Sequence, residues 1–245
     1  MRIDVLSLFP EMVQSPLQQS IIGRACANGI IDLRVHNIRD FTTDKHHVVD
    51  DSPFGGGSGM VMKVEPLFEA IRSIDPENKA RKILTDASGD RFNQVAAKKL
   101  MAEDWLMIIC GHYKGVDERL KELFDITEIS IGDYVLTGGE IPALVIIDSV
   151  VRLVPSVIKE ISSAETDSFF EGLLSFPEYT QPREFKGLGV PEILISGNHE
   201  KIRQWRLAQS LKKTLARRPD LLDLRELDDE EKMLLALEDK DVKSN

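Results

Sequence analysis

The chain has 245 residues, 42% of them hydrophobic and 29% charged, which is typical of a globular protein large enough to bury a core. Its net charge of −10 argues against bulk binding of polyanions, so any contact with nucleic acid must come from a local basic patch. The two cysteines form no CxxC pair, the first residues lack a continuous apolar run and no segment is long enough to span a membrane, which together predict a cytoplasmic protein without a membrane partner.

Through about residue 160, short apolar runs alternate with longer amphipathic ones. Strands are predicted at residues 3–8, 31–35, 82–85, 106–110 and 126–129. Helices are predicted at residues 18–27, 65–73, 94–101, 116–124 and 142–151. This alternation predicts an α/β domain with a parallel sheet covered on both faces, whose ligands bind beyond the carboxyl ends of the strands.

The pattern changes after Pro155. A polar stretch at 161–171 is predicted to be a flexible linker between a domain of residues 1–160 and a small, mainly helical domain of residues 172–245, with helices at 199–216 and 228–236. Between residues 196 and 218 seven Lys and Arg residues stand against the single acid Glu200. This basic helix is either a solvated surface or a surface that contacts phosphates.

Two loops that combine glycines with a tyrosine follow predicted strands. Residues 110–119 contain Tyr113 and residues 130–140 contain Tyr134. Glycine lets the backbone approach a ligand closely and adopt positive φ, whereas each loop taken alone is also compatible with a tight turn beside a core helix. Two such loops in one domain favour a ligand site.

A third glycine cluster has four glycines within residues 55–59. It is either a flexible surface connection or a loop that passes close to a phosphate backbone. No G-x-G-x-x-G follows the first predicted strand and no P-loop motif is present, which excludes the ordinary dinucleotide and P-loop classes. His46 and His47 lack a third ligand at suitable spacing, so no metal site is predicted.

Two charged residues flank the predicted linker and are the acid–base candidates. They are Arg152 and Asp167. Asp167 also has a structural interpretation, because Ser168 and Glu171 fit a capping box at the start of a helix.

Four motifs occur together along the chain. In order, they are Asp51-x-Pro-x-Gly-Gly-Gly-x-Gly-Met60, Cys110-Gly-His-Tyr-x-Gly-Val-Asp-Glu-Arg119, Ser130-Ile-Gly-Asp-Tyr-Val-Leu-x-Gly-Gly-Glu140 and Pro177-x-Tyr-Thr-x-Pro182. They resemble the bacterial tRNA (guanine-N1)-methyltransferase family, TrmD, of the SPOUT superfamily, and the likeness covers nearly the whole chain. The resemblance implies a deep trefoil knot in the first domain and a homodimer whose active sites are shared between subunits.

The resemblance also implies the reaction and the residues that perform it. S-adenosyl-L-methionine would donate a methyl group to N1 of the guanosine immediately 3′ of the anticodon, in tRNAs where another guanosine precedes it. Asp167 would be the general base and Arg152 its partner. The implied cofactor-binding residues are Thr85, Gly111, Tyr113, Gly115, Ile131, Gly132, Asp133, Tyr134, Val135, Leu136, Gly138, Gly139 and Pro142. The residues expected to contact the anticodon arm are Gly57, Gly59, Ser168, Lys201, Arg203 and Arg206.

The sequence departs from the family pattern at two places. The first cofactor loop usually reads close to Leu-Ser-Pro-Gln-Gly, but here Leu84-Thr-Asp-Ala-Ser-Gly89 lacks the proline and is one residue longer. Lys114 stands where the family commonly has a glutamate. Family members are associated with magnesium dependence, which this sequence neither supports nor excludes.

Two other classes of function remain open at the level of sequence. A non-catalytic RNA-binding module would keep the glycine loops as architecture and show no affinity for the cofactor. A SPOUT enzyme that modifies ribose hydroxyls would not need Asp167 as a base toward a ring nitrogen.

Overall fold

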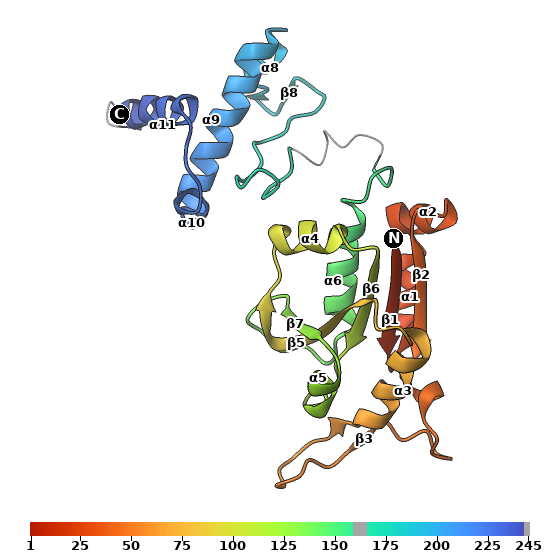
Figure 1. Ribbon diagram of the computed structural model, residues 1–245. Helices are drawn as coiled ribbons and strands as arrows, with labels where there is room; N and C mark the ends of the chain where they lie inside the picture. The colour runs from red at the N-terminus through yellow and green to blue at the C-terminus, as the bar shows by residue number, and fades with distance from the viewer. Residues whose placement is uncertain (159–165, 243–245) are drawn as a thin grey trace. The chain divides into compact units, whose positions relative to one another are not determined.

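A computed structural model describes residues 1–158 and 166–242, with side chains described as far as residue 236. The chain divides into two compact units, Met1–Lys159 and Glu160–Asn245 (Figure 1). Part of the predicted linker, residues 161–165, lies outside the described residues.

The first unit is built on one five-stranded sheet. Its strands are β1 (Arg2–Ser7), β2 (Asp32–Asn37), β5 (Arg81–Arg91), β6 (Trp105–Cys110) and β7 (Ile126–Ser130). Their order is β2-β1-β6-β5-β7, and every neighbouring pair is parallel. The predicted α/β fold with a parallel sheet is therefore confirmed. Only β5 differs much from its predicted length, because its pairing with β7 resumes at Asp90 after an irregularity that begins at Thr85.

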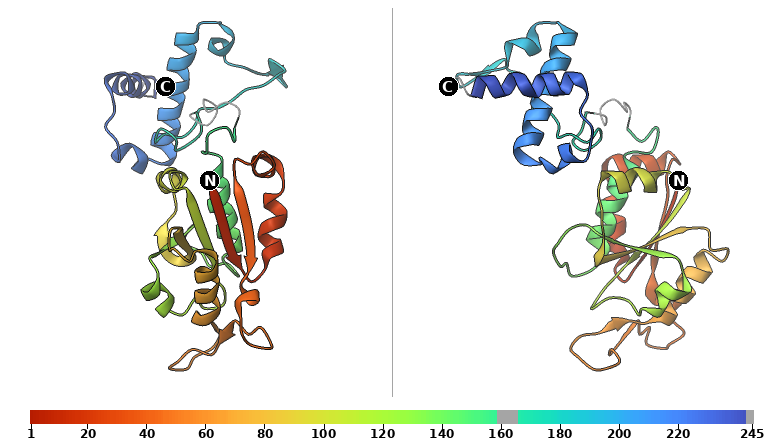
Figure 2. Two further views of the ribbon diagram at one scale, coloured as in Figure 1. Left: turned by 45° about the vertical axis from the view of Figure 1, so that its right-hand side comes forward. Right: turned by 60° about the vertical axis from the view of Figure 1, so that its left-hand side comes forward.

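Helices cover both faces of this sheet. One hydrophobic cluster joins the sheet to α1 (Pro10–Leu17), α2 (Ser20–Ala27), α4 (Gln94–Met101) and α6 (Glu140–Val151). A second cluster joins the opposite face to η1 (Ile38–Phe41), α3 (Val64–Ile74) and α5 (Arg119–Leu123) (Figure 2).

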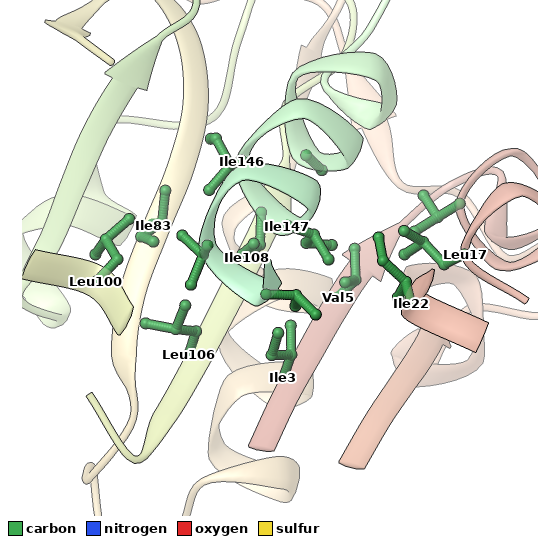
Figure 3. Packing of buried hydrophobic residues seen from close by; sticks show 14 of the residues in the cluster. Ile3, Val5, Leu17, Ile22, Ile83, Leu100, Leu106, Ile108, Ile146 and Ile147 are labelled. Atoms are coloured by element: carbon green, nitrogen blue, oxygen red, sulfur yellow. The ribbon is translucent and has the colours of Figure 1, made fainter. Parts of the chain in front are cut away.

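The period-2 geometry of the strands divides their side chains between these clusters. In β6, Leu106 and Ile108 belong to the first cluster, whereas Met107 and Ile109 belong to the second. Figure 3 shows Ile108 beside Ile146 and Ile147 of α6. The central strands are apolar on both faces because both faces are covered.

Helix α1 does not appear among the predicted helices. Pro10 occupies its first position, where the missing N–H would have no partner within the helix. Pro16 stands inside the helix, close to its end. Prolines at these places are compatible with a short helix, and the predicted helix at 18–27 accordingly begins two residues later, at Ser20.

The glycine cluster at 55–59 lies within a small antiparallel hairpin. Its strands are β3 (Asp50–Asp51) and β4 (Val61–Met62). The hairpin also pairs with the loop after β6, since Met62 forms a parallel bridge with Val116. The turn between β3 and β4 is therefore attached through its base to the carboxyl end of the main sheet.

The second unit contains α8 (Glu192–Ile195), α9 (His199–Arg217), α10 (Asp220–Asp223), α11 (Asp229–Val242) and the short hairpin of β8 (Glu184–Phe185) and β9 (Leu188–Gly189). The Oδ1 atom of Asn198 accepts a hydrogen bond from the Lys201 N–H at 3.1 Å and so caps the start of α9. The hydroxyl of Thr214 is buried and accepts from the Leu174 N–H at 2.9 Å, which fixes the preceding segment on α9.

The predicted capping box at Ser168 is wrong, because residues 168–173 form turns and bends and no helix begins there. The Ser168 hydroxyl instead accepts from the Ser175 N–H at 2.9 Å and lies 3.0 Å from the Ser175 hydroxyl. The Phe169 N–H donates to the Leu173 carbonyl at 2.7 Å. The serine therefore closes a short loop instead of capping a helix.

Asp4 of β1 is a wholly buried acidic residue. Its carboxylate accepts from Arg2 Nε at 2.7 Å and from Trp105 Nε1 at 2.7 Å, and His36 Nε2 lies 2.6 Å away. Burial would raise the pKa of Asp4, but the hydrogen bonds with His36, Arg2 and Trp105 outweigh it and lower the pKa. Asp4 thus joins β1 to both neighbouring strands as a carboxylate.

We expect Asp4→Asn to lower the free energy of unfolding by roughly 1.5–3 kcal/mol at pH 7, because it replaces a charged acceptor of buried hydrogen bonds. The folded pKa lies below the ordinary value of 3.8, so this stabilisation is complete above pH 3.8 and is lost as pH falls through the folded value. Urea unfolding of both proteins at pH 7 and near pH 3 measures the difference. The matched control is Asp32→Asn, which removes a half-exposed partner of Arg34 and should cost no more than about 1 kcal/mol.

Candidate active site

A cavity of about 280 Å³ lies at the carboxyl ends of β6 and β7 and beside Thr85, where the first regular part of β5 ends. Its walls come from residues 85–87, 111–115, 129–132 and 134–139, together with Pro142 of α6. The carboxyl ends of parallel strands meet at one edge of a sheet, which is where the sequence predicts a ligand. The structure has a hollow at that edge.

The two glycine–tyrosine loops contact each other directly across this cavity's floor. The Gly139 N–H donates to the Gly111 carbonyl at 2.7 Å, and His112 pairs with Gly138 in an antiparallel bridge. The buried hydroxyl of Thr85 accepts from the Gly111 N–H at 3.3 Å and lies 3.3 Å from the Gly139 carbonyl. Thr85 therefore joins β5 to both loops by hydrogen bonds.

The glycines at this junction are required by space. A Cβ on Gly139 would overlap the Thr85 hydroxyl and lie 2.6 Å from the Gly111 nitrogen. A Cβ on Gly111 would lie 2.8 Å from the Thr85 carbonyl oxygen. Gly139 has φ of −84°, which any residue adopts, so its role is to allow close approach of the two backbones. Positive φ is needed at Gly115, where φ is +123°.

Most of the cofactor-binding residues expected from the family resemblance line this one cavity. They are Thr85, Gly111, Tyr113, Gly115, Ile131, Gly132, Tyr134, Val135, Leu136, Gly138, Gly139 and Pro142. The exception is Asp133, which is not part of the wall. Seven further wall residues did not appear in the expected set: Asp86, Ala87, His112, Lys114, Ile129, Ser130 and Thr137. Each lies within two residues of an expected one along the chain, and that proximity is the signal that identifies it.

Lys114 connects the cavity to the glycine cluster. Its N–H donates to the Met60 carbonyl at 3.0 Å, and the Met62 N–H donates to the Gly115 carbonyl at 3.0 Å. Its side chain lies against Gly59, where a Cβ would be 3.0 Å from the Lys114 Cε atom. The loop that contains Gly57 and Gly59 is therefore attached to the wall of the cavity.

Buried polar groups lie around the same wall. Glu140, the first residue of α6, is buried and accepts from the Ser7 hydroxyl at 2.7 Å, where the helix N-terminus favours a carboxylate. Burial, aided by the charge of Glu140, raises the pKa of Cys110 well above its usual range, so this thiol is protonated and not a nucleophile. Burial raises the pKa of Tyr113, and the charge of Asp50 adds to it.

His112 carries an unusual ring nitrogen. Its Nδ1 atom is buried and has no hydrogen-bond partner within the described part of the chain. Rings lie on two sides of it, with the Phe9 centroid at 5.3 Å and the Tyr113 centroid at 4.7 Å. The imidazole therefore has a defined position in the cavity wall.

The acid–base candidates belong to different units. Arg152 follows α6 in the first unit, and Asp167 is an exposed residue of the second. Neither unit by itself contains both groups.

The basic residues of α9 differ in their surroundings. Arg203 pairs with Glu200 at 2.8 Å and with Glu230 at 2.6 Å, and the hydrogen bonds to these carboxylates raise its pKa. Arg206 lies over the Phe176 ring, 4.8 Å from its centroid. Lys201 is exposed on the first turns of the helix. The charge of Arg203 is already compensated, whereas Arg206 is held by an aromatic face.

Neither a metal-binding cluster nor a membrane-spanning helix is found among the described residues. No group of three or more His, Cys, Asp or Glu side chains among them is arranged to hold a metal ion. Within residues 1–158 and 166–242, no helix combines the length and apolar character needed to cross a membrane.

Comparison with known proteins gives consistent matches over nearly the full length. A family model described as tRNA (Guanine-1)-methyltransferase TrmD matches residues 1–224. A tRNA (guanine-N(1)-)-methyltransferase of Carboxydothermus hydrogenoformans is 56% identical over 235 residues, covering 96% of this chain and 92% of that protein. The proteins of that name from Dictyoglomus turgidum and Geobacter metallireducens are 54% and 52% identical, covering 96% and 98% of this chain and 95% and 98% of their own lengths.

Proposed function

The chain belongs to the TrmD family of tRNA (guanine-N1)-methyltransferases, and we propose that its target is the guanosine immediately 3′ of the anticodon, in tRNAs where a guanosine precedes it. The enzyme methylates N1 of guanine in tRNA, as the family match and the relatives' names show. The family implies S-adenosylmethionine as the methyl donor. The cytoplasm, where tRNA is modified, is the proposed compartment.

The proposed cofactor site is the cavity at the carboxyl ends of β6 and β7 and beside Thr85. The observation that carries the proposal is its wall of closely packed glycine backbone, in which Gly111 and Gly139 leave no room for a side chain. Apolar side chains of Ile131, Leu136 and Pro142 also line it and suit a purine ring. S-adenosylmethionine supplies a methyl group on a sulfonium centre, which requires no metal to activate it.

Two residues are proposed to act on the guanine. N1 of guanosine carries a proton and must lose it before its lone pair can attack a methyl group. The carboxylate of Asp167 is proposed to take this proton, and the guanidinium of Arg152 is proposed to stabilise the negative charge that develops toward O6. A target base in a folded anticodon arm has to turn out of its stack to reach them. No step is assigned to magnesium.

The two units are proposed to bind different substrates. Residues 1–160 would bind the cofactor, residues 161–171 would link the units, and residues 172–245 would bind the anticodon arm. Gly57, Gly59 and Ser168 would contact the same arm near the target. The attachment of the glycine cluster to Lys114 and Gly115 supports this, because the cluster is joined to the wall of the proposed cofactor cavity.

The first unit is also proposed to be knotted. After β7, at the edge of the sheet, the chain returns past the end of β5 to the end of β6, where Gly139 bonds to Gly111. It then enters α6, which packs on the sheet. A return path of this kind supports the deep trefoil knot that the family implies.

The active enzyme is proposed to be a homodimer with shared active sites. Helices α1 and α6 pack together and expose apolar side chains to solvent, including Met12 at 45%, Ile141 at 45% and Val145 at 40% of their surface. Adjacent exposed apolar groups of this kind mark interaction surfaces.

A complementation experiment tests the shared site. We expect Arg152→Ala and Asp167→Ala homodimers to be nearly inactive. After subunit exchange in an equal mixture, half of the dimers are mixed and each has one intact site, so activity should return to about a quarter of wild type. Native mass spectrometry confirms the exchange. No recovery in a proven mixed dimer would place both residues on one chain at each site.

The nucleotide specificity is tested with unmodified tRNA transcripts and labelled S-adenosylmethionine. We expect 1-methylguanosine as the product, formed only when guanosine follows the anticodon, and a large loss when the preceding guanosine is replaced. Nucleoside analysis separates the alternatives. A 2′-O-methyl product would support a ribose methyltransferase, and absence of both cofactor affinity and product would support a binding module.

A further inference from the structure

The second unit contains a cavity of its own, of about 530 Å³. It lies among the segment at 177–183, helix α8 and the first turns of α9. Small-ligand pockets have volumes of about 300–1,000 Å³, so the space suits one nucleotide or a molecule of similar size. The motif Pro177-x-Tyr-Thr-x-Pro182 forms one side of this cavity and has no other role in the proposed reaction.

Two arginines stand in the wall of the cavity. Arg183 and Arg206 line it together with His199 and one acidic residue, Glu178. Within the described residues, neither arginine has a carboxylate at ion-pair distance, in contrast to Arg203 and Arg218, which have Glu200, Glu230 and Asp220 as partners. In a chain of net charge −10, two uncompensated guanidinium groups in one hollow favour an anionic ligand.

Contacts position the backbone of Arg183 and the guanidinium of Arg206. The backbone bond from the Val190 N–H to the Arg183 carbonyl, at 2.9 Å, closes the β8–β9 hairpin beside the cavity. The guanidinium of Arg206 lies over the Phe176 ring. His199 is the first residue of α9, a helix of 19 residues whose N-terminus also favours an anion.

An aromatic face and an apolar surface complete the cavity. Tyr179 lines it with 48% of its surface exposed, and its ring centroid lies 6.4 Å from that of Trp205, which supports it from α9. Val190, Leu194 and Ile202 supply apolar contacts. Proteins recognise unpaired nucleotides by stacking the base on an aromatic ring and binding the phosphate with cations. The cavity has both parts.

We propose that this cavity binds one unstacked nucleotide of the tRNA, distinct from the guanosine that is methylated. The base contacts Tyr179, and its phosphate contacts Arg183 and Arg206. The inference rests on tRNA being the substrate but not on which guanosine is modified. It assigns the RNA contact of the second unit to the cavity and removes Arg203 from that role, because two carboxylates already neutralise it.

The test uses the full-length enzyme and unmodified tRNA transcript. Tyr179→Ala should weaken tRNA binding about 10-fold or more, whereas Tyr179→Trp, which keeps a stacking face, should bind within a few fold of wild type. Arg183→Ala should weaken binding and reduce the slope of log Kd against log salt by about 1. Cofactor affinity by calorimetry and the melting temperature should match wild type in all three variants. A matched charge removal, Lys232→Ala on the exposed face of α11, should leave both tRNA binding and activity unchanged.

Two outcomes would overturn the proposal. One is tRNA binding by Tyr179→Ala and Arg183→Ala that equals binding by Lys232→Ala. The other is tight binding of free AMP or GMP in this cavity, lost in Arg183→Ala while tRNA binding stays the same, which would assign the site to a small nucleotide. These binding results do not depend on methyl transfer, so a wild-type enzyme that methylates another position would refute the proposed target and leave this test valid. Photocrosslinking of 4-thiouridine transcripts to the 177–183 segment identifies the bound nucleotide.

Discussion

Asp167→Asn should slow methyl transfer by about 10²–10⁴-fold in a single turnover with saturating tRNA and cofactor, because an amide cannot accept the N1 proton of guanine. This loss corresponds to about 3–5 kcal/mol of activation free energy. Single-turnover conditions isolate the chemical step from tRNA binding and product release. The melting temperature and the cofactor affinity should stay near wild type, because Asp167 is an exposed residue outside any helix.

The structure makes this experiment easier to interpret. A helix cap at Ser168 would have given Asp167 a structural role, but the Ser168 hydroxyl bonds to Ser175 and no helix starts there. Glu171→Gln is the matched control, since it converts another exposed carboxylate of the same loop to an amide. It should react at the wild-type rate. A near-normal rate for Asp167→Asn would mean that another group removes the proton.

Gly139→Ala should abolish high-affinity binding of S-adenosylmethionine, with a loss of at least about 10-fold, and should lower the stability of the first unit by about 1–3 kcal/mol. The loss of affinity follows from the place of Gly139 in the wall of the proposed cofactor cavity. The structure adds the stability cost, because the new Cβ would overlap the Thr85 hydroxyl and lie 2.8 Å from the Cys110 Cα atom. Calorimetry measures the affinity, and urea unfolding measures the stability.

Two further variants test whether crowding around the new Cβ causes the effects of Gly139→Ala. Thr85→Ala combined with Gly139→Ala removes the overlapping hydroxyl but leaves the Gly111 nitrogen 2.6 Å from the new Cβ, so rescue should be incomplete. Gly189→Ala is the control for a general effect of removing a glycine, because nothing lies within 4 Å of its Cβ. Cofactor affinity in folded Gly139→Ala equal to wild type would remove the cavity as the binding site.

The sheet was predictable from sequence because buried parallel strands are short apolar runs with a fixed period. Features that depend on partners distant in the sequence could not be predicted in this way. The extension of β5 beyond Thr85 follows from the pairing of Asp90 with Ile129 of β7, 39 residues away, and no local pattern reports it. The capping box at Ser168 matched a local rule, but the hydroxyl found a competing partner in Ser175.

The candidate site could also be predicted only in part. Its glycine loops were identifiable from motifs, since close approach of two backbones requires glycine at Gly111 and Gly139. The ion pairing of the basic helix could not be predicted, because Arg203 pairs with Glu230, which belongs to a different helix and lies 27 residues away in the sequence. A count of basic residues along one helix cannot distinguish a compensated arginine from one that is available to a phosphate.

The main-chain construction of the cofactor cavity bears on how the enzyme could be inhibited and how resistance could arise. An inhibitor that bonds to the backbone around Gly111 and Gly139 would use atoms that every residue possesses, so exchange of the side chain would not remove those contacts. Nor could the contacts be blocked by a larger residue without cost, since the space at both glycines is already filled by Thr85 and neighbouring backbone. Resistance by point substitution at Gly111 or Gly139 would therefore also impair binding of the natural cofactor. An inhibitor that depended on the exposed side chains of Tyr134 or Val135 could lose affinity when those side chains are exchanged.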